Sequence, residues 1–101
     1  MADDRQSQAC FLAEVFAPGR KPEQRRAEAD HVRVAAEALA RAGTPVLYLE
    51  SLYVPGEEIA FYLFRADRPD EVDHVLHDAG LEAERISPVM ATAGMLEPQE
   101  R

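Results

Sequence analysis

Two histidines and an aspartate in the second half of the chain have the residue types of a metal site. His74 and His77 lie three positions apart in a segment with a helical pattern, and Asp70 precedes His74 by one turn. Residues at this spacing share a helix face, and imidazole with carboxylate suits Ni²⁺, Cu²⁺ or Zn²⁺. The sequence therefore predicts a candidate metal site at Asp70, His74 and His77. The alternative is a solvated helix face on which aspartates pair with the histidines.

A second group of candidates combines two carboxylates with two phenols in segments that favour β-strands. Its members are Glu14, Tyr48, Glu50 and Tyr62. Because an unpaired buried carboxylate is costly, each glutamate should contact water, a cation, an arginine or a tyrosine hydroxyl. A carboxylate whose pKa is raised by burial can act as a general base, so these four residues are the predicted catalytic set if the protein is an enzyme. The alternative is that Glu14 pairs with an arginine and Glu50 points to solvent.

The remaining residues with reactive side chains give little indication of chemistry. Cys10 is the one cysteine, so a disulfide within the chain is excluded, as is a cysteine-based metal site within one subunit. We expect Cys10 to fill space as a small apolar residue and His31 to lie at the boundary of a buried helix stripe. The sequence contains no glycine-rich phosphate loop, nucleophile elbow or HExxH motif, so no enzyme class is indicated.

Four strands are predicted to position these residues. Aromatic and branched side chains on either side of Pro55-Gly56 predict a hairpin of two strands, at 46–54 and 58–65. The stretch at 9–16 predicts the first strand and 85–91 the last. Pro88, within the last strand, places that strand at a sheet edge, because proline cannot donate to a central ladder.

Two helices are predicted between the strands. The first covers 22–42, where strong helix formers follow Pro22 and Gly43 stops the helix. The second starts at Pro69, after a cap at Asp67 or Arg68, and stops at Gly80. Apolar residues at helical spacing should form the buried stripes. These residues are Val32, Ala35, Ala36 and Leu39 in the first helix, and Val72, Val75, Leu76 and Ala79 in the second.

The element order, strand–helix–strand–strand–helix–strand, predicts an α+β fold. Short connections and right-handed crossovers make the ferredoxin-like βαββαβ sandwich the simplest result. Two helices would cover one face of a four-stranded antiparallel sheet, with the first and third strands central. The single domain would span 9–91, with a flexible amino terminus at 1–8 and a flexible tail at 92–101.

The face that each hairpin residue occupies depends on the length of the turn, since a shift of one residue reverses every side chain. We expect an odd-length loop or a bulge, which would separate an aliphatic face, covered by the helices, from an aromatic face. A loop of two or four residues would instead pair Glu50 with Phe61. The expected aliphatic set is Leu47, Leu49, Ile59, Phe61 and Leu63, and the expected aromatic set is Tyr48, Glu50, Leu52, Ala60, Tyr62 and Phe64.

The face without helices would be too apolar to stay exposed in a monomer. A patch of this size exceeds what soluble monomers usually tolerate, and a two-fold dimer is the commonest remedy. The sequence therefore predicts a homodimer through the sheet face, with room for a small ligand between the sheets. The patch would comprise Leu12, Phe16, Tyr48, Leu52, Tyr62 and Phe64.

Length and charge limit the kinds of partner. The chain has 101 residues, and its 19 acidic residues outnumber its 11 basic ones, giving a net charge of −8. An acidic surface without a basic cluster argues against nucleic-acid binding. No apolar run of ~18 residues predicts a membrane span, and the amino terminus does not resemble a signal peptide, so a cytoplasmic location is the expectation.

Over about residues 10–90, the chain resembles a family of small ferredoxin-like domains of unknown function that includes a nickel-binding protein. The resemblance implies a dimeric αβ sandwich and makes nickel or another divalent metal the implied cofactor. It rests on the order and spacing of four blocks: LAEVFAPG at 12–19, VLYLESLYVPGEE at 46–58, AFYLFRAD at 60–67 and AGLEAERISPV at 79–89.

Three functions therefore remain open. The first is a dimeric, non-enzymatic binding protein for a divalent metal or a small ligand held against the sheet. The second is a small dimeric αβ-barrel enzyme, an isomerase, cyclase or cofactor-free oxygenase, with Glu14 or Glu50 as the base. The third is a structural or regulatory dimer without a ligand.

Overall fold

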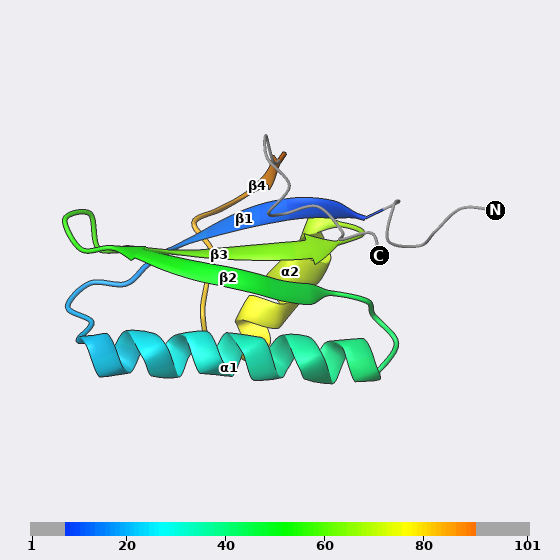
Figure 1. Cartoon of the computed structure of the whole chain (residues 1–101), viewed down its shortest axis with the longest axis horizontal. Coiled ribbons are helices and arrows are strands. Elements are labelled where there is room, and N and C mark those ends of the chain that lie inside the picture. The colour runs from blue at the N-terminus through cyan, green and yellow to red at the C-terminus, as the bar shows by residue number, and fades with distance from the viewer. Residues whose placement is uncertain (1–7, 91–101) are drawn as a thin grey trace, which may run out of the picture.

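The sheet and both helices lie within residues 8–90, the part of the chain that the computed structural model describes (Figure 1). The elements are β1 (Ala9–Phe16), α1 (Pro22–Arg41), β2 (Leu47–Val54), β3 (Ile59–Ala66), α2 (Pro69–Asp78) and β4 (Arg85–Val89). All pairings are antiparallel and the strand order is β2-β3-β1-β4, so β1 and β3 are central. The predicted ferredoxin-like fold is confirmed, with β4 and its Pro88 at an edge. The predicted flexible termini lie outside the described residues, apart from Gln8.

Local hydrogen bonds at the helix starts explain where the helices begin. The backbone N–H of Lys21 donates to the side-chain oxygen of Gln24 at 2.7 Å, just before Pro22 opens α1. At α2, the Glu71 carboxylate accepts from the N–H groups of Asp67 and Arg68 at 3.0 and 3.3 Å. These contacts satisfy amide groups that a helix start leaves without partners.

A four-residue loop and a bulge together determine the β2–β3 register. Val54 pairs with Ile59 across the loop, so the odd-length loop, one of the two expected possibilities, is wrong; the other, a bulge, is present beyond Glu50. Glu50 therefore pairs with Leu63 and lies on the same face as Phe61. The register then shifts between Tyr48 and Glu50, so Leu49 is the extra residue and Tyr48 pairs with Phe64.

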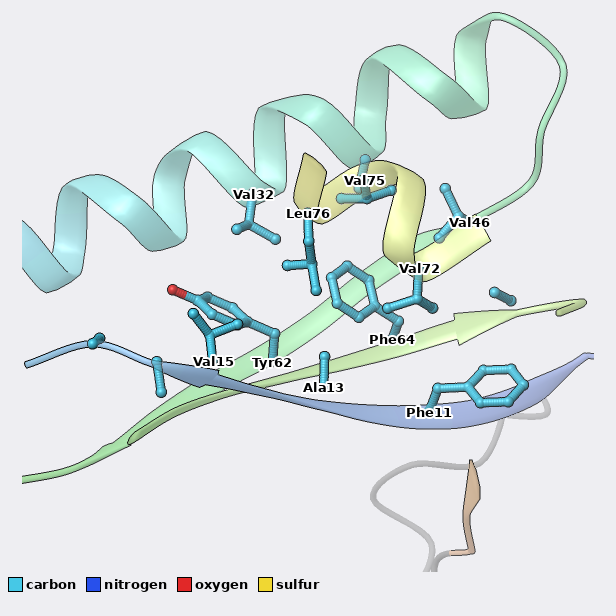
Figure 2. Packing of buried hydrophobic residues seen from close by; sticks show 14 residues of the cluster. Phe11, Ala13, Val15, Val32, Val46, Tyr62, Phe64, Val72, Val75 and Leu76 are labelled. Atoms are coloured by element: carbon cyan, nitrogen blue, oxygen red, sulfur yellow. The ribbon is translucent and has the colours of Figure 1, made fainter. Parts of the chain in front are cut away.

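The helices cover the face of β3 that was predicted to be exposed. Tyr62 and Phe64 are 2% and 0% exposed and pack against Val32 of α1 and Leu76 of α2 in one buried cluster (Figure 2). On β3, the set with Tyr62 and Phe64, rather than the expected set with Ile59, Phe61 and Leu63, therefore faces the helices. The apolar stripes predicted on both helices are confirmed: the buried members are Val32, Ala36, Val72, Val75 and Leu76, and Ala35, Leu39 and Ala79 are partly buried.

The opposite side of the sheet is here called the open face. No helix or strand of the described residues covers it (Figure 1). Leu12, Phe16 and Leu52 lie on it as predicted, whereas Tyr48, Tyr62 and Phe64 do not. Its apolar residues are Leu12, Phe16, Leu47, Leu52, Val54, Ile59, Phe61 and Leu63.

Neither α1 nor α2, the helices of the described part, has the length and apolar character needed to cross a membrane.

Candidate functional site

The four residues of the predicted catalytic set lie on two different sides of the sheet. Glu14 pairs with Phe61 and Glu50 with Leu63, which places both carboxylates on the open face. Tyr48 and Tyr62 lie on the helix side, where Tyr62 is buried. Because the sheet separates the two pairs, the tyrosines cannot act on a ligand that contacts the carboxylates.

Glu14 is held by an arginine of the neighbouring strand. The Nε of Arg85 donates to Glu14 Oε2 at 3.1 Å, and the Glu14 side chain is 21% exposed. Glu50 lies on the edge strand β2 and is exposed, with β3 between it and Glu14. Both observations match the alternative considered for these residues: an arginine partner for Glu14 and a solvated position for Glu50.

A hollow on the open face brings Glu14 close to a second carboxylate. This hollow, of about 300 Å³, is lined by Glu14, Phe16, Ile59 and Glu84. The backbone N–H of Glu84 donates to the carbonyl oxygen of Glu14 at 2.6 Å, which fixes the loop before β4 against β1. Two carboxylates beside two apolar side chains would suit a ligand that has an apolar body and a positively charged group.

The residues of the predicted metal site make ion pairs of their own. His74 Nε2 lies 3.4 Å from Asp78 Oδ2, and Asp70 Oδ1 lies 3.5 Å from Arg68 Nε. Within residues 8–90, no group of three or more histidine, cysteine or acidic side chains is arranged to hold a metal ion. Metal binding at Asp70, His74 and His77 stays a prediction, to which a second subunit would have to contribute ligands.

Cys10 and His31 occupy the kinds of position expected for them. Cys10 is half-buried on β1, and His31 is exposed on α1 next to buried Val32. Neither residue lines the hollow beside Glu14.

A second hollow, which the sequence did not predict, lies on the helix side of the sheet. We call it the α1 hollow; it has a volume of about 290 Å³ and lies between the first turns of α1 and strands β2 and β3. Its lining consists of Pro22, Arg25, Arg26, Glu28, Ala29, Ser51, Leu52, Tyr53, Ala60 and Tyr62. The one sequence signal was the pair of adjacent arginines, Arg25 and Arg26, at the start of a helix in an acidic protein.

Two tyrosines shape the α1 hollow. The guanidinium of Arg25 lies over the ring of Tyr53, with Cζ 4.4 Å from the ring centroid. The Tyr53 hydroxyl donates to the carbonyl oxygen of Ala17 at 2.7 Å, which fixes that ring. Burial, and secondarily the nearby charge of Glu28, raises the pKa of Tyr62 to about 12, so its hydroxyl keeps its proton at neutral pH.

Comparison with known proteins supports the fold. No protein-family model matches the chain, and no curated protein matches it. A solved structure described as the crystal structure of SCO4226 from Streptomyces coelicolor A3(2) is similar, with a TM-score of 0.66 and 20% identity. The match covers 84% of this chain and 100% of that one. The likeness concerns the fold alone.

Proposed function

We propose that this protein is a homodimeric binding protein whose open faces meet and hold a small ligand between them. The observation that carries the proposal is the apolar character of the open face. Phe16 is 54% exposed, Leu47 50% and Leu52 63%, although all three lie on a sheet that could bury them against a second copy. Exposed apolar surface of this extent usually marks an interaction site.

The ligand proposed is a small molecule with an apolar body and a cationic group. In a face-to-face dimer, the hollow lined by Glu14, Phe16, Ile59 and Glu84 would be roofed by the partner. Arg85 already engages Glu14, which leaves Glu84 as the carboxylate without a side-chain partner among the described residues. Burial beside apolar groups would strengthen the attraction of this carboxylate for a cation.

Binding is proposed in preference to catalysis, because the predicted base and the predicted tyrosines are on opposite sides of the sheet. The proposed ligand site does not include the metal predicted at Asp70, His74 and His77. Those residues are on α2, which lies on the side of the sheet opposite the open face.

The dimer can be tested with Leu63→Lys, which adds a charge at the middle of the open face. Leu63 lies on central strand β3 opposite Leu12, and its side chain points away from the helices, so the core should be preserved. We expect native mass spectrometry to show a monomer, because burying an unpaired ammonium group opposes association. Circular dichroism should show an unchanged fold.

Val34→Lys is the matched control for this experiment. Val34 is 48% exposed and lies on α1, so the same charge is added to an apolar surface residue away from the open face. It should leave the dimer intact. Equal dissociation by both variants, or by neither, would contradict the proposed interface.

The ligand site can be tested with benzylamine as a probe of an apolar cation. We expect saturable shifts of the Phe16 and Glu84 amide signals in nuclear magnetic resonance spectra, weakened about tenfold by Glu84→Gln because one of two carboxylates is lost. Benzyl alcohol, which is similar in size and uncharged, is the control ligand. Equal binding of benzyl alcohol would show that the carboxylates do not select the ligand.

A further inference from the structure

The α1 hollow lies on the helix side of the sheet, opposite the proposed dimer interface, and only Leu52 of the edge strand β2 belongs to both. Its walls come from the first turns of α1 and from β2 and β3. Its volume of about 290 Å³ is near the lower end of the range of ~300–1,000 Å³ found for small-molecule sites. Any ligand bound there must therefore be small.

Two hydrogen-bond donors in the α1 hollow have no acceptor among the described residues. The Nε of Arg25 is buried and makes no hydrogen bond. Tyr62 is 2% exposed, and no hydrogen bond of its hydroxyl is found in residues 8–90. Figure 2 shows this hydroxyl pointing from the sheet toward α1. A buried donor without an acceptor, as Arg25 Nε is, is costly, so an acceptor from outside the chain would be stabilising here.

The charge of the α1 hollow is opposite to that of the protein as a whole. Arg25 and Arg26 line it and make no ion pair within the described part of the chain. The one carboxylate in the lining, Glu28, is already neutralised by Arg20, whose Nε lies 2.5 Å from Glu28 Oε2. In a chain of net charge −8, this is a locally positive site. It favours an anion.

The geometry points to a binding site for a small organic carboxylate, with Arg25 as its anchor. A guanidinium presents parallel N–H donors that match the two oxygens of a carboxylate. Stacking on Tyr53 holds the Arg25 guanidinium in place before a ligand arrives, which lowers the entropic cost of binding. Pro22, Ala29 and Ala60 would contact the apolar body of the ligand, which inorganic phosphate lacks.

Benzoate is a suitable probe, with benzamide as its uncharged isostere and benzylamine as a ligand of opposite charge. We expect benzoate to shift the Arg25 Nε–H signal and the Tyr53 and Ala60 amide signals of the isotope-labelled full chain in a saturable manner. Benzamide should bind at least about tenfold more weakly, because the charge-assisted pair with Arg25 is lost. Benzylamine should leave these signals unchanged.

Arg25→Gln should weaken benzoate binding by at least about tenfold, whereas Arg33→Gln should change it by less than about twofold. Arg33 is a matched control, because it is an exposed arginine of the same helix that pairs with Asp30 and Glu37 instead of facing the hollow. Arg25→Lys keeps the charge but removes the paired donors, and should give intermediate affinity if Arg25→Gln does not fold.

Three results would overturn this inference: no saturable shift with benzoate, equal affinity for benzoate and benzamide, or unchanged benzoate binding in Arg25→Gln. Because Arg25, Tyr53 and Ala60 all lie on the helix side of the sheet, none of these results depends on whether the open face dimerises.

Discussion

At the scale of single residues, Tyr62 connects the core with the α1 hollow. Its side chain is among the largest fully buried ones, and Tyr62 also lines the hollow. A buried phenol resists ionisation, because the phenolate would lose its hydration. The pKa of Tyr62 is accordingly raised from 10.0 to about 12 in the folded protein.

This raised pKa predicts a loss of stability at alkaline pH. Below pH 10.0 the phenol is protonated in both the folded and the unfolded state, so it has no effect on the pH dependence. Between pH 10.0 and about 12 the unfolded state loses the proton first, so the free energy of unfolding falls as the pH rises. With allowance for solvent screening, the expected loss is about 1–2 kcal/mol.

Urea unfolding of the wild type and of Tyr62→Phe, measured across this pH range, isolates the contribution of Tyr62. The phenylalanine variant keeps the ring but cannot ionise, so its stability should fall less steeply. Parallel curves for the two proteins would mean that Tyr62 ionises in the folded state as readily as in the unfolded state.

Glu14 illustrates how far the chemistry of a single residue could be predicted. A largely buried carboxylate on a central strand needs a partner, and an arginine was one of the partners expected. That this arginine would be Arg85 could not be predicted, because the pairing of β1 with β4 joins residues 71 positions apart. The α1 hollow was missed for the same reason: Arg25 and Tyr62 meet only once α1 packs on the sheet.

At the scale of elements, α1 offers a direct comparison of a buried and an exposed valine. Val32 is 0% exposed and packs against the sheet, whereas Val34 is 48% exposed on the same helix. We expect Val32→Ala to lower the free energy of unfolding by about 1.5–3 kcal/mol, because it removes buried methyl groups and leaves a cavity. Val34→Ala should change it by about 0.5 kcal/mol or less.

Chemical denaturation of the two alanine variants checks this prediction. Similar losses for both would mean that α1 does not pack on the sheet through the Val32 face.

The helices and the strand order could be predicted from sequence, whereas the register of the hairpin could not. Apolar residues at helical spacing and flanking prolines and glycines identify α1 and α2 independently of other elements. The register depends on Glu58, which adopts a left-handed conformation with φ of 58° in the four-residue loop, and on the bulge at Leu49. A bulge was one of the two expected possibilities, but glutamate and leucine have no preference for these positions, so neither the four-residue loop nor the place of the bulge could be predicted.

This one difference in register changed the expected surface. Near the loop, it joins Glu50 and Leu52 to the face of Phe61 and Leu63, and the helices cover the opposite face, with Tyr62 and Phe64. The prediction that an apolar face would remain without helices is unaffected, because both sets of β3 residues are apolar. The expected members of that face were partly wrong.

At the scale of the whole molecule, a two-layer sandwich leaves one side of its sheet without a covering element. The helices occupy one side, and the described chain offers no third layer for the other (Figure 1). A second copy supplies an apolar surface that matches this one by symmetry. Because folding of such a protein is linked to association, the thermal midpoint of the full chain should rise with protein concentration.

The most direct measurement is the mass of the full-length protein in solution at micromolar concentration, by native mass spectrometry or sedimentation equilibrium. We predict twice the chain mass of 11.2 kDa. A mass of 11.2 kDa that does not change with concentration would contradict the proposed dimer, and with it a ligand site enclosed between two sheets.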